Sequence, residues 1–190
     1  MSGSVPLASL WLPIVVSALL LQIVSFASYM LLKLHKNDWK GVPDERSLRD
    51  VLRRQNIAPG QYMIPFCPSP DGMKKPEEMQ KYVEGPVAVF IVAPPGVPPF
   101  GRNLGLMLLY FLVVSVFVAC VLAHTLLPGT PVRELFGIAW TVAFLAYGAA
   151  NIPDAIWYGR PAGVTIRGLI DALIWAVVTA ATFGAFWSKS

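Results

Sequence analysis

The sequence contains few of the residues that metal and redox chemistry require. It has two histidines and two cysteines among 190 residues, and charged residues make up only 14% of the chain. It contains no HExxH or CxxC motif, no phosphate-binding glycine loop and no recognisable Ser/His/Asp set. We therefore expect no metal site and no cofactor, and a non-enzymatic role is favoured over an enzymatic one.

Apolar residues, in contrast, are abundant. They make up 55% of the chain, and the mean hydropathy of +0.58 is too high for a water-soluble domain of this size. A helix needs roughly 20 apolar residues to cross the hydrocarbon core of a bilayer. Four runs are long enough, at residues 8–32, 104–127, 135–157 and 164–187. The first run has no basic leader and exceeds the ~7–15 residues of the apolar h-region of a signal peptide, so we expect it to be retained as a span.

Lys and Arg residues are distributed unevenly between the two sides of these spans. Eleven lie between the first and second spans, and Arg160 and Arg167 follow the third span on the same side. The other side has only Arg133 and Lys189. Because positive charge favours the cytoplasmic side, both termini are predicted to lie outside. The net charge of +4 then reflects topology in a lipid bilayer and gives no reason to expect nucleic-acid binding.

This topology separates the four cysteine and histidine residues. Cys67 is predicted to be cytoplasmic and Cys120 to lie near the outer end of the second span, so we expect two free thiols. His35 and His124 end the first and second spans at opposite surfaces, separated by the ~30 Å hydrocarbon thickness. They are not expected to share a haem or a metal within one subunit.

The segment between the first two spans is charged and interrupted by prolines. A short amphipathic helix is predicted between Pro43 and Pro59, and a second from Pro76 to Gly85. Residues 61–66 are predicted to form an edge strand, and residues 87–93 a buried strand. So small a sheet is marginal alone, so we expect this domain to dock on the membrane surface.

The predicted fold class is membrane all-α, a four-helix transmembrane bundle with a small α+β cytoplasmic domain inserted between helices 1 and 2. The first transmembrane helix with its outer N-terminus occupies residues 1–34, and the cytoplasmic α+β domain residues 35–102. Transmembrane helices 2 to 4, with an outer C-terminus, occupy residues 103–190.

Small residues recur at every fourth position of the last span. They are Gly168, Ala172, Ala176, Ala180 and Gly184. Such a face lets another helix approach closely and gain dispersion contacts that lipid does not replace. The third span has a matching stripe of Ala139, Ala143, Ala146 and Ala150, which favours packing of spans three and four within one chain over a homodimer seam.

Charged and polar residues gather at the predicted cytoplasmic end of the last two spans. They are Asp154, Tyr158, Arg160, Arg167 and Asp171. Asp171 lies within a span, where an ionisable group costs at least ~2.5–3.5 kcal/mol unless it is paired or hydrated. Arg167, one helical turn earlier, is expected to pair with it, so a structural ion-pair cluster is favoured over a proton or substrate site. His35 with Asp38 is interpreted as an interfacial anchor, with a pH-sensitive role as the alternative.

Several segments together resemble a known group of proteins. They are LWLPIVVSALL, HKNDW, GQYMIPFC, GPVAVFIVAPPG, TVAFLAYG and IWYGRP. This layout resembles a group of small bacterial inner-membrane proteins to which no activity is attached. The resemblance implies residence in the bacterial inner membrane and carries over no catalytic residue, cofactor or binding site.

Three classes of function are compatible with these observations. The favoured one is a non-enzymatic accessory or assembly subunit, whose cytoplasmic domain contacts a membrane-protein partner. The alternative is an oligomeric transporter or channel subunit that uses Asp171, because four helices rarely enclose a pathway alone. A membrane enzyme ranks third, since no nucleophile and base can be assembled on one side.

Overall fold

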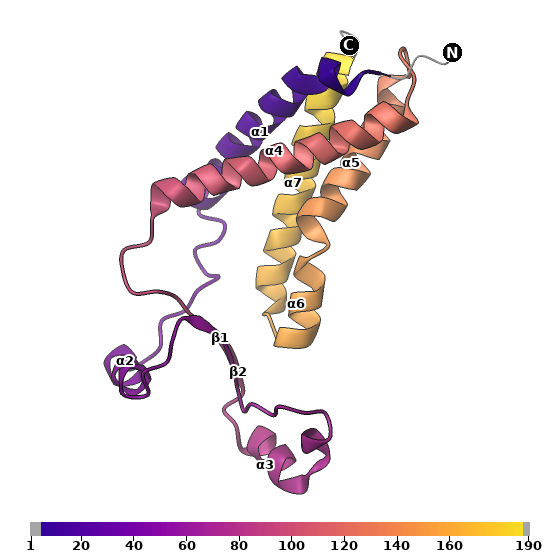
Figure 1. Cartoon of the computed structure of the whole chain (residues 1–190). Coiled ribbons are helices and arrows are strands. Elements are labelled where there is room, and N and C mark those ends of the chain that lie inside the picture. Colours follow the sequence, from indigo (N-terminus) through magenta and orange to yellow (C-terminus); the bar gives the residue numbers. More distant parts are fainter. Residues whose placement is uncertain (1–4, 188–190) are drawn as a thin grey trace. The chain divides into compact units, whose positions relative to one another are not determined.

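The structure is a computed structural model that describes residues 5–187 and divides into two compact units. The membrane unit contains the chain up to Lys40 and from Pro99 onward, and the inserted unit is Gly41–Pro98. Figure 1 shows the elements of each unit. Residues 35–40 belong to the membrane unit, although the sequence placed them at the start of the inserted domain. Lys189, which entered the prediction of orientation, lies outside the described residues.

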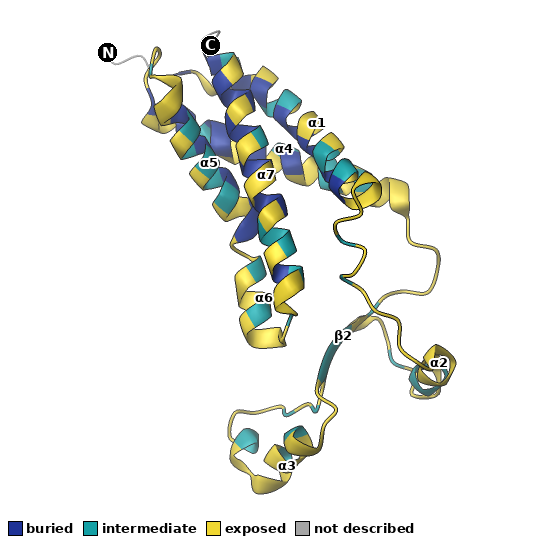
Figure 2. Ribbon diagram, turned by 180° about the vertical axis from the view of Figure 1, so that it is seen from behind, coloured by how far each residue is buried: buried dark blue, intermediate teal, exposed yellow. Residues whose placement is uncertain are grey.

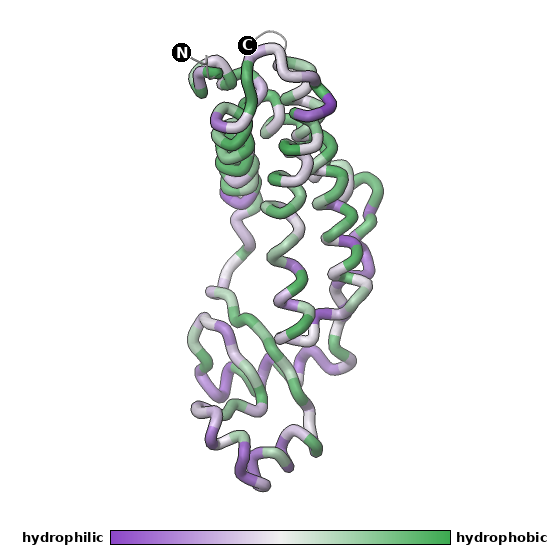
Figure 3. Tube along the Cα trace, turned by 90° about the vertical axis from the view of Figure 1, so that its right-hand side faces the viewer, coloured by the Kyte–Doolittle hydropathy of each residue, from purple (hydrophilic) through white to green (hydrophobic). Residues whose placement is uncertain are grey.

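Within residues 5–187, four helical segments are long and apolar enough to cross a membrane, as predicted. They are Leu7–Leu31, Phe100–Thr125, Val132–Tyr158 and Ala162–Trp187. Hydrophobic residues run along all four, and hydrophilic ones gather towards their ends (Figure 3). The first segment begins and the last one ends at the same end of the membrane unit (Figure 1). The protein therefore has the architecture of a multi-pass membrane protein.

The first segment changes its helical form twice. A 3₁₀ turn, η1 (Leu7–Leu10), leads into α1 (Trp11–Phe26), which is followed by a π-helical turn, η2 (Ala27–Leu31). In η2, the Leu32 amide donates to the Ala27 carbonyl at 2.9 Å. Lys33 then adopts a left-handed backbone conformation with a φ of 52°, which ends the helix.

The third segment is interrupted near its end. It consists of α5 (Val132–Gly148) and α6 (Asn151–Tyr158). Pro153 explains the break, because proline has no amide hydrogen and its ring clashes with the carbonyl four residues earlier. The Asn151 side-chain amide donates to the carbonyls of Tyr147 and Gly148, both at 3.3 Å, and so partly compensates for the helical hydrogen bonds lost there.

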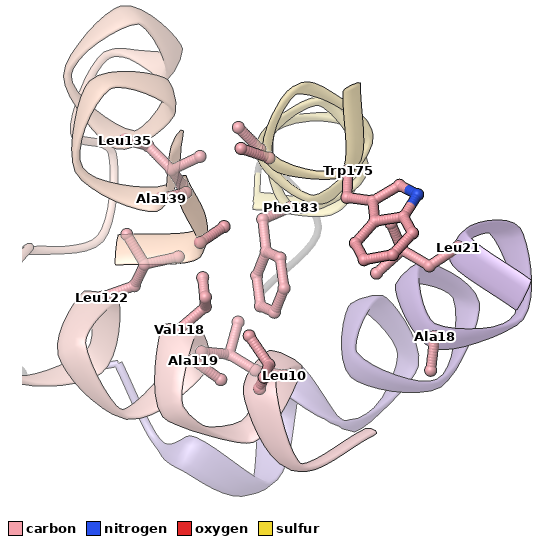
Figure 4. Close-up of a cluster of buried hydrophobic side chains, with 14 of the residues drawn as sticks. Leu10, Ala18, Leu21, Val118, Ala119, Leu122, Leu135, Ala139, Trp175 and Phe183 are labelled. Carbon is pink, nitrogen blue, oxygen red and sulfur yellow. The ribbon is translucent and has the colours of Figure 1, made fainter. Parts of the chain in front are cut away.

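The hydrophobic core of the membrane unit lies between α1, α4 (Phe100–Thr125), α5 and α7 (Ala162–Trp187). Figure 4 shows the Phe183 ring lying among Leu10, Val118 and Ala119, all of which are fully buried. Apolar side chains also cover the outside of these helices, as a lipid environment requires. Buried residues in Figure 2 are confined to the membrane unit.

The small residues of α7 lie against α5. A Cβ atom added at Gly148 would stand 3.1 Å from the Cβ of Ala172, and one added at Gly184 would stand 3.1 Å from Cγ1 of Val132. Ala172, Ala176 and Ala180 are fully buried, and Gly168 lies beside the Asn151 side chain. In the third segment, Ala139 and Ala143 are buried but Ala146 and Ala150 are exposed, because the packed face continues through Tyr147 and Gly148.

The inserted unit follows the predicted order of helix, strand, helix, strand. Its elements are α2 (Glu45–Arg54), β1 (Gly60–Ile64), the short turn η3 (Gly72–Lys74), α3 (Pro76–Glu84) and β2 (Ala88–Val92). The strands pair antiparallel, with Tyr62 opposite Phe90. The carboxylate of Asp44 caps α2 by accepting a hydrogen bond from the Ser47 amide at 3.0 Å.

The prediction that the second strand is buried is wrong. No residue of β2 is buried, and Ile91 is 76% exposed. A two-stranded ribbon provides too little surface to cover an apolar strand, and the two short helices do not enclose it. Every residue of 41–98 is at least partly exposed.

Candidate functional site

Five polar side chains, from two consecutive segments after α1 and from α7, meet at the end of the bundle opposite the start of α1. They are Ser28 in η2, His35 and Asp38 in the connection after it, and Arg167 and Asp171 in α7. His35 Nε2 lies 2.7 Å from Asp171 Oδ2, and His35 Nδ1 lies 2.7 Å from Asp38 Oδ2. The Ser28 hydroxyl donates to Asp171 Oδ1 at 2.8 Å, and the Arg167 guanidinium donates to Asp38 Oδ1. We call these five residues the His35 cluster.

The backbone after α1 places His35 and Asp38 in the cluster. The left-handed residue Lys33 turns the chain back, and the Leu34 amide donates to the Ser28 carbonyl at 3.2 Å. The Asp38 amide then donates to the His35 carbonyl at 3.0 Å in a second tight turn. The imidazole of His35 stacks on the Tyr29 ring, with centroids 4.0 Å apart and planes inclined by 7°. This stacking and the two turns fix the direction in which the imidazole points.

The ionisable groups of the cluster are largely withdrawn from solvent. The side chain of Asp171 is 4% exposed, that of His35 is 9% and that of Asp38 is 10%. Burial of a charge is costly unless it is paired and hydrogen-bonded, and here each carboxylate oxygen has a partner. The hydrogen bond from His35, followed by that from Arg167, holds the pKa of Asp38 below its usual range.

The predicted pair between Arg167 and Asp171 is not formed. Arg167 forms its ion pair with Asp38, and Asp171 is contacted by His35 and Ser28 instead. The one-turn spacing on α7 therefore identified two members of the cluster but assigned them the wrong partners. The correct partners come from 129 to 143 residues earlier in the chain.

The other three predicted residues lie outside the cluster. Arg160 donates to the Asn151 side-chain oxygen at 3.0 Å and so supports the break between α5 and α6. Asp154 and Tyr158 are exposed on α6, and neither side chain forms a hydrogen bond or ion pair with another described residue. Of the five predicted residues, only Arg167 and Asp171 are thus brought together.

A cleft adjoins the cluster. It has a volume of about 520 Å³, and both Asp38 and Arg167 line it, together with Trp39, Lys40 and Gly163. Asp38 and Arg167 therefore belong both to the His35 cluster and to the lining of this cleft. In residues 5–187, no group of three or more His, Cys, Asp or Glu side chains is arranged to hold a metal ion.

Comparison of the chain with protein-family models, curated proteins and solved structures finds no match.

Proposed function

We propose that this chain is a non-enzymatic protein of the bacterial inner membrane, an accessory subunit that binds a protein partner through its inserted unit. The bundle acts as the membrane anchor, with both termini outside. The thirteen basic residues on one side of the spans, against two on the other, support an orientation with the inserted unit in the cytoplasm.

One observation carries the proposal, namely that the inserted unit has no core of its own. No residue of 41–98 is buried, and large apolar side chains such as Phe66, Val83 and Ile91 are 71%, 78% and 76% exposed. A two-stranded sheet is at best marginally stable in water. Contact with an apolar surface outside the unit would supply the missing burial, at roughly 25 cal/mol per Å².

The charge of the inserted unit favours a protein over an anionic lipid surface as that partner. Residues 41–98 contain seven basic and seven acidic side chains, so their formal net charge is zero. Many are paired locally, such as Lys81 with Glu78 at 2.7 Å and Lys74 with Asp71 at 2.9 Å. Binding to anionic lipid depends on an excess of Lys and Arg. A neutral surface with exposed apolar side chains better suits the apolar surface of a protein subunit.

The test is purification of the tagged full-length protein from native membranes in mild detergent, followed by native mass spectrometry. We expect a stoichiometric partner that is lost in Val83→Asp, because a charge would replace an exposed apolar side chain of α3. Gln80→Asp is the matched control, because it adds the same charge to an exposed polar position of the same helix. A chain that emerges alone, or a complex that tolerates Val83→Asp as well as Gln80→Asp, would contradict the proposal.

A second candidate function is an oligomeric transporter or channel subunit that uses Asp171. The observation in its favour is a buried carboxylate contacted by a histidine, an arrangement frequent in proton relays. Fully buried Leu10, Leu122, Leu135 and Phe183 fill the far end of the bundle, so a pathway would have to run between subunits. Flux of the reconstituted protein should be abolished in Asp171→Asn with its oligomeric state unchanged. Undiminished flux in this variant would exclude the transport role.

A further inference from the structure

We propose that His35, Asp38 and Asp171 form a proton-binding site that holds residues 33–40 against α7 when the proton is bound and releases them when it is lost. This proposal does not depend on the partner of the inserted unit. It rests on the geometry of the two contacts made by the imidazole.

Both ring nitrogens of His35 lie 2.7 Å from a carboxylate oxygen. A neutral imidazole has one N–H donor and one acceptor nitrogen, whereas an ionised carboxylate can only accept. In either tautomer, therefore, one of the two contacts would place a lone pair against a carboxylate oxygen. Both contacts become hydrogen bonds only when the three groups hold one additional proton, either on the imidazole or on a carboxyl group.

The charges around the site favour the same state. With His35 neutral, the two carboxylates and Arg167 leave a net charge of −1 in a largely buried group, whereas the additional proton brings the sum to zero. The neighbours from η2 are Ser28, which donates to Asp171, and Tyr29, which stacks on the imidazole. Arg160, which precedes α7, donates to the Asn151 side chain and lies outside the cluster.

The other basic groups near this part of the chain do not replace the proton. Lys33, Lys36 and Lys40 lie in the same connection, and all three are exposed. No carboxylate of the cluster is within ion-pair distance of these lysines in the described residues, and Asp154 of α6 lies outside the cluster. The charge of the buried group therefore changes with the bound proton itself.

The cleft beside the cluster gives the proton a route from water. Asp38 lines this cleft of about 520 Å³ and contacts His35, which in turn contacts Asp171. A proton can thus pass from the cleft through two hydrogen bonds to a carboxyl group inside the bundle. Asp38 and His35 are the groups that exchange it.

Loss of the proton would free the chain that leads into the inserted unit. Residues 33–40 end directly before Gly41, the first residue of that unit. Eight released residues can extend by up to roughly 26 Å at about 3.3 Å per residue. Binding of a proton would therefore decide whether these eight residues are held against α7 or are free to extend.

The experiment uses the full-length protein in lipid nanodiscs, with ¹⁵N-labelled histidine for NMR and hydrogen exchange read at residues 33–40. Between about pH 5 and pH 9 we expect one proton to leave the cluster. At the same pH, exchange at these residues, corrected for its intrinsic rate, should rise at least tenfold. The NMR signals of the only other histidine, His124, are identified by their loss in His124→Gln. This variant should keep the pH dependence of exchange at residues 33–40.

His35→Gln should abolish the pH dependence, because the glutamine amide keeps the same N–H donors and acceptor oxygen at every pH. Exchange at residues 33–40 that is independent of pH in the unmodified protein would overturn the proposal. So would a pH dependence that persists in His35→Gln. The measurement on the unmodified protein decides the question even where a variant fails to fold.

Discussion

The two units of this chain contain similar apolar residues but only one of them has a core. In the membrane unit, Leu122, Leu135 and Phe183 are fully buried between long helices, whereas Phe66 and Ile91 of the inserted unit are 71% and 76% exposed. The difference lies in the length of the elements. Helices of 16 to 26 residues present apolar stripes to several neighbours, whereas strands of five residues and helices of nine or ten do not surround anything. Apolar composition alone therefore does not produce a core.

The largest difference in stability is expected between truncation of a buried and of an exposed apolar side chain. Phe183→Ala should lower the free energy of unfolding by about 3–5 kcal/mol, because it leaves a cavity in the hydrophobic core of the bundle. Ile91→Ala should change it by less than about 0.5 kcal/mol. Both are measured by denaturant titration in detergent micelles with helicity as the signal. Similar losses in the two variants would show that the inserted unit is packed after all.

A smaller effect is expected where α5 and α7 pack most closely. Gly148→Ala would bring a Cβ to 3.1 Å from that of Ala172, so we expect a loss of about 1–3 kcal/mol from overpacking. Gly137, also in α5, has nothing within 4 Å of an added Cβ, and Gly137→Ala should be neutral or stabilising by up to about 1 kcal/mol. The same titration measures both. Equal effects of the two substitutions would mean that α5 does not approach α7 at Gly148.

Much of this fold is predictable from the sequence because its signals are local. Apolar runs of about 20 residues define the four spans, and Pro76 and Asp44 mark the starts of two short helices. The break in the third span was missed, although Pro153 marks it, because hydropathy is continuous across it. Burial of β2 was predicted wrongly, since an apolar strand does not reveal what covers it.

The site was predictable only in part, since its contacts are not local. Asp171 is conspicuous as a charge within an apolar run, and helical spacing suggested Arg167 as its partner. The actual partner, His35, reaches Asp171 through a π turn and a left-handed lysine. Neither has a sequence signal here, because lysine is not a residue that favours a positive φ. The sequence predicted His35 and Asp38 as an interfacial anchor and did not predict their contacts with Asp171 and Arg167 of α7.

The smallest effects are expected from two ion pairs, one in each unit, and concern how the stability of the folded state depends on pH. The folded-state pKa of Asp38 is lowered, by His35 first, so its pairing stabilises the folded state above the ordinary carboxyl range and is lost as the pH falls through the lowered value. The pKa of Lys81 is raised, by its hydrogen bond to Glu78 first, so that stabilisation is present at neutral pH and is lost as the pH rises through the raised value.

Because Lys81 and Glu78 are solvent-accessible, Glu78→Gln should leave the alkaline limb of the stability curve almost unchanged. Asp38→Asn should measurably reduce the dependence of stability on pH in the acid range. Hydrogen exchange at residues 33–40 measures this change. If Asp38→Asn altered the stability at acid pH no more than Glu78→Gln alters it at alkaline pH, burial would not distinguish the His35 cluster from a surface ion pair. If only Asp38→Asn altered the stability, the stabilising contribution would belong to the partly buried network of the membrane unit.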